Sequence, residues 1–353
     1  MNRYWSNILN EIDPYVPGEQ PQDKKYIKLN TNENPYPPSP RVMDAVKKSA
    51  NEDLRLYPDP SCNILRSTIA EYYNLKKDNI FVGNGSDEIL ALAFYAFFKQ
   101  NKPILFPDIT YSFYEPYSLF FNINFEKIQV TQALEIRLDD YMKPNGGIIF
   151  ANPNAPTGRY IPLKDIESLI NSNKDSVVVV DEAYVDFGGE SAILLTEKYP
   201  NLLVVHTLSK SRALAGMRIG YAIGDKGLIY GLDRAKNSFN SYTLDRLALV
   251  AGIEAFKDRI YFEQSRDKII STRVWITKKL IEIGFSVIPS KTNFIFIEHK
   301  KVQAKKIFNE LREQGILVRY FDKPRIDNFM RITIGTDDEM NMFIESLIKI
   351  ISD

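Results

Sequence analysis

The chain has 353 residues, enough for more than one domain, and 44% of them are hydrophobic. Its 45 basic and 45 acidic residues cancel, which offers no support for binding to nucleic acid or to an anionic membrane surface. One cysteine excludes a disulfide framework, and two histidines without a Cys/His cluster argue against a zinc site, so we expect no metal. No segment reaches the roughly 20 apolar residues of a membrane-spanning helix or resembles a signal peptide. We therefore expect a cytoplasmic protein.

The beginning of the chain is rich in proline and lacks helical periodicity, which predicts an extended N-terminal arm over residues 1–38. A helix should follow, with Ser39 as its N-cap and Pro40 at its first position. A second helix should begin after Ser61, behind a turn at residues 55–60.

The middle of the chain alternates short apolar runs with helical patterns. The first run, Ile80–Val82, leads through Gly83-Asn84-Gly85 into a helix that begins near Ser86. Further strands are expected at Ile104–Phe106, Asn124–Val130, Gly147–Ala151, Val177–Val180, Leu202–Val205 and Ile219–Ile223, with helices at Tyr111–Phe121, Leu163–Ile170 and Lys226–Lys236. This alternation predicts an α/β fold with a mostly parallel sheet covered by helices.

The last third of the chain predicts a smaller α+β domain. Two long amphipathic helices, Asp245–Phe256 and Asp258–Ile283, should come first, and the second should link two domains. Strands are then expected at Phe285–Ile288, Phe294–Ile297, Ile316–Arg319 and Met330–Ile334, with helices at Val302–Gln314 and Asp337–Ile351. We therefore expect a large domain over residues 39–257 and a small domain over residues 258–353, with the arm packed against the small one.

Lys210 stands out chemically because it closely follows the buried run Leu202–Val205. Burying an unpaired ammonium is costly, so a lysine in such a place loses its proton more easily and can attack an aldehyde to form a Schiff base. The glycine turn before Ser86 would expose backbone N–H groups at a helix N-terminus, which suits a phosphate. The plain alternatives are a surface lysine on a polar loop, and an ordinary strand-to-helix connection capped by Ser86 or Asp87.

Several motifs support the interpretation of Lys210 as a Schiff-base lysine and of the glycine turn as a phosphate site. They are Gly83-Asn84-Gly85-Ser86-Asp87, Asn152-Pro153-Asn154-Ala155-Pro156-Thr157-Gly158, Asp181-Glu182-Ala183-Tyr184, Ser209-Lys210 with Arg218, the arm segment at residues 28–35, the turn at Tyr57 and the segment around Arg331. Together they resemble the fold-type I pyridoxal-phosphate (PLP)-dependent aminotransferases, and most closely the histidinol-phosphate aminotransferase branch. The resemblance runs from about Asp13 to the C-terminus and implies that fold and a PLP cofactor.

The resemblance also implies roles for individual side chains around PLP. Lys210 would form the Schiff base and move the proton, Asp181 would keep the ring nitrogen protonated, and Tyr184 would donate to the ring oxygen. Tyr111 would stack on the ring. The phosphate would be bound by Ser86, Asp87, Ser209 and Arg218, and by Tyr57 from the other subunit of a homodimer. A turn aspartate and ordinary core tyrosines are the simpler alternatives for Asp181, Tyr184 and Tyr111.

One position departs from the family pattern. The family usually has asparagine directly before Pro-Thr-Gly, where its side chain bonds the ring oxygen, whereas this chain has Ala155 there and Asn154 one residue earlier. Either Asn154 serves instead through a shifted loop, or Tyr184 carries the contact alone.

The resemblance implies that Arg331 binds substrate carboxylate, that Arg319 lies near the substrate phosphate, and that Tyr15 and Asn32 close over the substrate. Exposed surface charge is the alternative for both arginines. We expect transamination between L-histidinol phosphate and 2-oxoglutarate in histidine biosynthesis. An aromatic or broad-specificity aminotransferase, a threonine-phosphate decarboxylase and, more remotely, a non-catalytic PLP-fold binding module remain alternatives, because Lys210 and Asp181 do not distinguish the enzymes.

Overall fold

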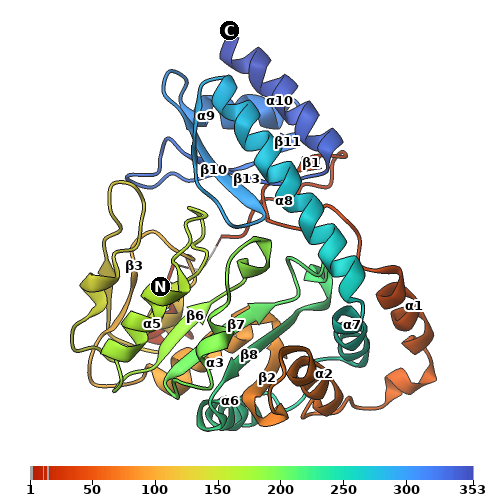
Figure 1. Cartoon of the computed structure of the whole chain (residues 1–353), viewed down its shortest axis with the longest axis vertical. Helices are drawn as coiled ribbons and strands as arrows, with labels where there is room; N and C mark the ends of the chain where they lie inside the picture. The colour runs from red at the N-terminus through yellow and green to blue at the C-terminus, as the bar shows by residue number, and fades with distance from the viewer. Residues whose placement is uncertain (1–2, 11, 14–15, 353) are drawn as a thin grey trace.

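The computed structural model describes residues 3–10, 12–13 and 16–352. Most of the chain is organised around a seven-stranded sheet, here called the large sheet, with the strand order β2-β8-β7-β6-β5-β3-β4 (Figure 1). Strand β8 is antiparallel to β2 and β7, and the other neighbours pair in parallel. The strands are β2 (Ile80–Asn84), β3 (Ile104–Pro107), β4 (Phe125–Ile128), β5 (Ile148–Ala151), β6 (Val178–Asp181), β7 (Leu202–Thr207) and β8 (Ile219–Gly224).

Both faces of the large sheet are covered, which explains why its central strands are continuous apolar runs. Val178 and Val180 of β6 belong to one buried cluster, while Val179 between them belongs to another on the opposite face. The covering helices are α1 (Pro40–Ser49), α2 (Asn63–Tyr73), α3 (Gly85–Phe97), α4 (Tyr114–Phe120), α5 (Leu163–Ser172), α6 (Lys226–Phe239) and α7 (Arg246–Lys257). Short 3-10 turns lie at Asn7–Asn10, Glu52–Arg55, Lys77–Asn79, Leu138–Tyr141, Val185–Phe187, Ala192–Leu195 and Ala215–Met217.

The C-terminal part forms a second layered unit around a four-stranded antiparallel sheet, here called the small sheet, with the order β12-β13-β10-β9. Helix α8 (Arg259–Glu282) leads from the end of α7 to this unit, as Figure 1 shows. The other elements are β9 (Phe285–Ile288), β10 (Phe294–His299), α9 (Ala304–Glu313), β12 (Arg319–Tyr320), β13 (Met330–Thr333) and α10 (Asp337–Ser352). A third buried cluster joins the small sheet to α8, α9 and α10.

The N-terminal arm is tied to this second unit. Strand β1 (Ile27–Lys28) pairs in parallel with β11 (Ile316–Leu317), and the main-chain N–H of Thr333 donates to the carbonyl of Leu29 at 2.9 Å. A chain segment distant in sequence thereby completes the edge of the small unit.

The α/β architecture agrees with the prediction, and Ser39 caps α1 by accepting from the N–H of Val42 at 3.2 Å. Three local predictions need correction. The strand expected at Ile316–Arg319 is two strands, because β11 pairs with the arm and β12 with β13. The helix expected from Tyr111 begins at Tyr114. Helix α3 begins at Gly85, so neither Ser86 nor Asp87 is its N-cap.

In the described ranges, no helix is long and apolar enough to cross a membrane. The same residues contain no group of three or more His, Cys, Asp and Glu side chains arranged to hold a metal ion.

Candidate active site

The predicted functional groups gather at one edge of the large sheet. Asp181 ends β6, Lys210 follows the end of β7, and the Gly85 turn follows β2, which runs in the same direction as β7 because both are antiparallel to β8. Arg218 reaches the same edge directly before β8 begins. In parallel sheets this edge, at the carboxyl ends of the strands, is where ligands bind.

Lys210 is partly buried, and its surroundings on balance favour the neutral amine. Its Nζ donates to the carbonyl oxygen of Thr31 at 3.3 Å and lies 5.9 Å from the centre of the Tyr184 ring. Burial, followed by the positive charge of Arg331, lowers the pKa of Lys210 to about 8. The side-chain amide of Asn34 donates to the carbonyl oxygen of Lys210 at 3.0 Å, so the arm also holds the lysine loop. With this pKa about a tenth of the amine is neutral at pH 7, far more than for an ordinary lysine, and the neutral amine is a usable nucleophile and base.

Asp181 is a carboxylate in the protein interior, only 4% exposed. It accepts a hydrogen bond from the Tyr114 hydroxyl at 3.0 Å and one from the N–H of Ala183 at 3.2 Å. Burial raises its pKa to about 6, and within the described ranges no cationic side chain forms an ion pair with it. A buried carboxylate of this kind fits a ligand that brings a protonated ring nitrogen of its own.

The turn before α3 forms a cradle suited to an anion. Gly85 has φ +77°, and a Cβ atom there would come within 2.6 Å of Nη2 of Arg218. Arg218 in turn lies 3.1 Å from Oδ2 of Asp87. Ser86 and Asp87 form the first turn of the 13-residue helix α3, whose free N–H groups and dipole favour negative charge. Ser209 is buried after β7 and accepts from the Thr207 hydroxyl at 2.9 Å.

Tyr111 and Tyr114 connect the cradle with Asp181. The Tyr111 hydroxyl donates to Oδ1 of Asp87 at 2.7 Å, and the two tyrosine rings meet edge to face at 5.7 Å. Tyr114 was not predicted from the sequence, because nothing in the pattern separates it from the chain's other tyrosines.

The Tyr184 hydroxyl contacts the arm. It accepts from Nδ2 of Asn32 at 2.9 Å, and its ring packs edge to face on Phe294 at 5.0 Å. Asn32 adopts φ 56°, and its N–H donates to the Thr333 hydroxyl at 2.9 Å. The predicted role of Asn32 in closing over the substrate stays a prediction, and its amide also orients Tyr184.

The two predicted substrate arginines are opposite each other in neighbouring strands of the small sheet, where Arg319 pairs with Arg331. Arg331 donates to the carbonyl oxygen of Asn30 at 3.0 Å and lies over the Phe294 ring at 5.3 Å. Arg319 donates to the carbonyl oxygen of Val16 at 3.1 Å. Both guanidinium groups therefore contact the arm, and Tyr15, the other arm residue predicted here, lies outside the described residues.

Two predicted cofactor residues have other contacts. The Asn154 amide is 1% exposed, accepts from Thr110 at 2.8 Å and donates to the carbonyl of Ile109 at 2.9 Å. These bonds tie it to the segment that follows β3. Tyr57 is 80% exposed and stacks on Tyr242 with the ring centres 4.6 Å apart.

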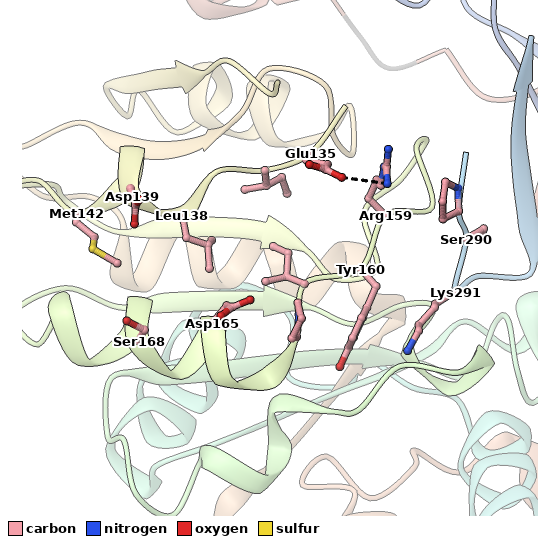
Figure 2. Close-up of a pocket in the computed structure, with 14 residues that line it drawn as sticks. Glu135, Leu138, Asp139, Met142, Arg159, Tyr160, Asp165, Ser168, Ser290 and Lys291 are labelled. Atoms are coloured by element: carbon pink, nitrogen blue, oxygen red, sulfur yellow. Dashed lines mark ion pairs between the residues drawn. The ribbon is translucent and has the colours of Figure 1, made fainter. Parts of the chain in front are cut away.

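A separate cavity of about 650 Å³ lies between the two units (Figure 2). Its walls come from residues 135–142, from the start of α5 and from Pro289–Lys291, and Arg159 pairs with Glu135 at 3.1 Å on its rim. It contains none of the predicted cofactor residues and mixes acidic with basic groups, so its charge selects no particular ligand.

Comparison with known proteins identifies the family. Residues 24–347 match the model of the family "Aminotransferase class I and II". A histidinol-phosphate aminotransferase from Clostridium acetobutylicum is 57% identical over 98% of this chain and 99% of its own length. One from Clostridium botulinum is 54% identical over 100% of this chain and 99% of its own length. The structure of histidinol-phosphate aminotransferase from Sinorhizobium meliloti in complex with pyridoxal-5'-phosphate shares the fold, with a TM-score of 0.90, 23% identity, and coverage of 100% of this chain and 98% of that chain. The chain therefore belongs to the class I and II aminotransferases, and within them to the histidinol-phosphate aminotransferases.

Proposed function

We propose that the protein transfers the amino group of L-histidinol phosphate to 2-oxoglutarate with PLP as cofactor, giving imidazole-acetol phosphate and L-glutamate in histidine biosynthesis. The observation that carries this proposal is Lys210, with its pKa lowered to about 8, at the same sheet edge as the buried carboxylate Asp181 and the Gly85 turn. The 57% identity to a histidinol-phosphate aminotransferase supports the choice of substrate.

The residues at this edge fit PLP. Asp181 supplies a buried anion for the ring nitrogen, and Arg218, Ser209 and the first turn of α3 supply donors for a phosphate. We assign to Tyr111 the packing against the ring and to Tyr184 the hydrogen bond to the ring oxygen, since the Asn154 amide already has partners. When bound, PLP supplies a ring that accepts the electron pair left on the substrate carbon after its proton is removed.

The chain's own groups manage the proton and the orientation of the substrate. The neutral amine of Lys210 removes the proton from the substrate carbon that bears the amino nitrogen. It then delivers the proton to the carbon on the other side of that nitrogen. Asn34 and the carbonyl of Thr31 fix the loop and the Nζ atom that perform this transfer. Asn32 holds the Tyr184 hydroxyl in place beside it.

Arg331 and Arg319 supply positive charge to a substrate pair that is anionic at both steps. An arginine fork can bind a phosphate or a carboxylate, so the same group serves histidinol phosphate and 2-oxoglutarate. The opposed positions of the two arginines in β12 and β13 support a shared anion site. Tyr15 is proposed to close this site from the arm.

We further propose that the enzyme is a homodimer in which Tyr57 reaches the phosphate of the neighbouring subunit. Its 80% exposure and its support by Tyr242 favour a contact outside its own protomer. A cytoplasmic location is consistent with the single, buried and free Cys62. We propose domain limits at residues 39–257 and 258–353, with the arm at residues 1–38.

Rates with three amino donors test the assignment. We expect kcat/KM with 2-oxoglutarate as acceptor to be highest for L-histidinol phosphate and far lower for L-phenylalanine. Release of carbon dioxide from threonine phosphate would indicate a decarboxylase instead. A preference for phenylalanine would retain the fold and cofactor but overturn the substrate. No turnover of any donor by the PLP-loaded protein would favour a binding module.

A further inference from the structure

Arg325 connects the loop between β12 and β13 with the large sheet. Its Nη1 lies 2.8 Å from Oδ2 of Asp108, directly after β3. Its Nη2 donates to the carbonyl oxygens of Val130 at 2.6 Å and Thr131 at 3.0 Å, beyond β4. One guanidinium group from the small-sheet unit thus binds two separate segments of the large-sheet unit.

On the large-sheet side, Asp108 begins the segment that leads to the proposed ring-stacking residue. Its Oδ1 accepts from the N–H of Val130 at 2.9 Å, which fixes the carboxylate for Arg325. The next residues, Ile109 and Thr110, bind the Asn154 amide, and Tyr111 follows. A shift of Asp108 would therefore be transmitted to the Tyr111 segment.

On the small-sheet side, Arg325 lies in the loop that joins the two proposed substrate arginines. Phe321 in this loop lies 5.9 Å from the Arg319 guanidinium and 5.8 Å from that of Arg331. Phe321 and Phe329 both pack on the Phe296 ring, with centres 5.9 Å and 4.7 Å away. The loop therefore contacts both guanidinium groups, which also hydrogen-bond to the arm, and helps to position them.

An apolar cluster lies behind the polar contact and spans the same junction. It contains Ile109, Val130 and Leu134 from the large-sheet side together with Phe296 and Ile326 from the small-sheet side. Arg325 itself has φ +72°, a left-handed conformation that is uncommon for a non-glycine residue. An isolated exposed ion pair contributes little stability. The Arg325 and Asp108 side chains are only 30% and 25% exposed, and Arg325 binds three acceptors, so this contact differs from such a pair.

We propose that Asp108 and Arg325 are positioning residues that fix the loop between Arg319 and Arg331 relative to the Tyr111 segment, in the arrangement that binds substrate anions. This inference rests on the proposed function. The side-chain hydrogen bonds of Asp108 and Arg325 go to each other and to Val130 and Thr131, and none of these goes to Lys210, Asp181 or Tyr184. Breaking the pair therefore weakens the binding of both substrates, since both use the same arginines, and leaves the chemical step largely intact.

The kinetic test compares Arg325→Ala, Arg325→Lys, Asp108→Asn and the double variant Asp108→Asn/Arg325→Ala. We expect Arg325→Ala to raise KM about tenfold for both the amino donor and 2-oxoglutarate, with kcat changed less than about threefold. Arg325→Lys should recover part of the loss, because a lysine can reach Asp108 but cannot bind three acceptors in the same geometry. The double variant should be little worse than either single variant.

Arg66→Ala is the matched control, because Arg66 pairs with Asp233 at 3.1 Å within the large-sheet unit, with side chains 12% and 25% exposed. It should lower stability without raising either KM. An unchanged KM in Arg325→Ala, or a loss of stability alone as in the control, would overturn the inference.

Hydrogen–deuterium exchange provides a readout that does not depend on activity. In the substrate-free protein, Arg325→Ala should increase exchange in residues 108–111 and 321–329 together, whereas Arg66→Ala should leave both segments unchanged. Exchange that increases only around residue 325 would contradict the coupling. If the wild type transaminates no donor, the proposed function fails, while the exchange experiment still decides whether the pair couples the two segments.

Discussion

Replacing Asp181 by asparagine should stabilise the cofactor-free protein at neutral and alkaline pH. The pKa of Asp181 is raised by burial from 3.8 to about 6, so the folded state binds this proton more tightly than the unfolded state. The stability that this tighter proton binding contributes is fully present below pH 3.8 and is lost as the pH rises through about 6. The difference between the two pKa values corresponds to about 3 kcal/mol, all of which Asp181→Asn should recover at high pH.

Urea unfolding of cofactor-free wild type and Asp181→Asn at two pH values measures this effect. About half of it falls between pH 5 and pH 7.5, so the stability advantage of the variant should grow by roughly 1–2 kcal/mol over that interval. Asparagine can still accept from the N–H of Ala183, which limits other changes. The same substitution should weaken PLP binding, because the partner of the ring nitrogen is lost. A variant that is less stable than the wild type at pH 7.5, or an advantage that does not depend on pH, would refute the reasoning.

Two further substitutions test the cradle and the junction between the units. Gly220→Ala would place a Cβ atom 2.5 Å from the backbone of Gly85 and Ser86. The affinity for PLP, measured by fluorescence titration, should therefore fall about tenfold or more. Gly216→Ala is the control and should bind PLP normally, because no atom lies within 4 Å of its Cβ position. Equal affinities would exclude a role for this turn in phosphate binding. Arg273 is buried and donates to two main-chain carbonyls, so Arg273→Leu should lower the free energy of unfolding by about 2–4 kcal/mol in urea titrations; a loss below about 0.5 kcal/mol would contradict this.

The sequence was most informative where a local pattern determines the structure. The apolar runs before Asp181 and Lys210 predict buried strands, and the rule that ligands bind at strand ends predicts that these residues lie at a common edge, which the structure bears out. The N-cap at Ser39 was predictable for the same reason, because capping depends on nearby residues.

Contacts between distant segments could not be predicted in this way. Nothing around Tyr114 indicates that its hydroxyl binds Asp181, 67 positions later. The break after Leu317 depends on the arm, which supplies β1 as the partner of β11. Arg325 looks like an ordinary loop arginine until Asp108 is placed opposite it. The roles proposed for the cofactor and substrate residues remain predictions that depend on the same kind of long-range contact.

The most direct test of the account is the visible absorption spectrum of the PLP-loaded protein before and after addition of L-histidinol phosphate, without a keto acid. We expect the band of the bound cofactor to disappear as pyridoxamine phosphate forms, in an amount equal to the number of active sites, and 2-oxoglutarate to restore the band. Lys210→Ala should show neither change at a comparable rate. A cofactor band that L-histidinol phosphate leaves unchanged would contradict the substrate, and the absence of any protein-bound band with excess PLP would contradict the role of Lys210.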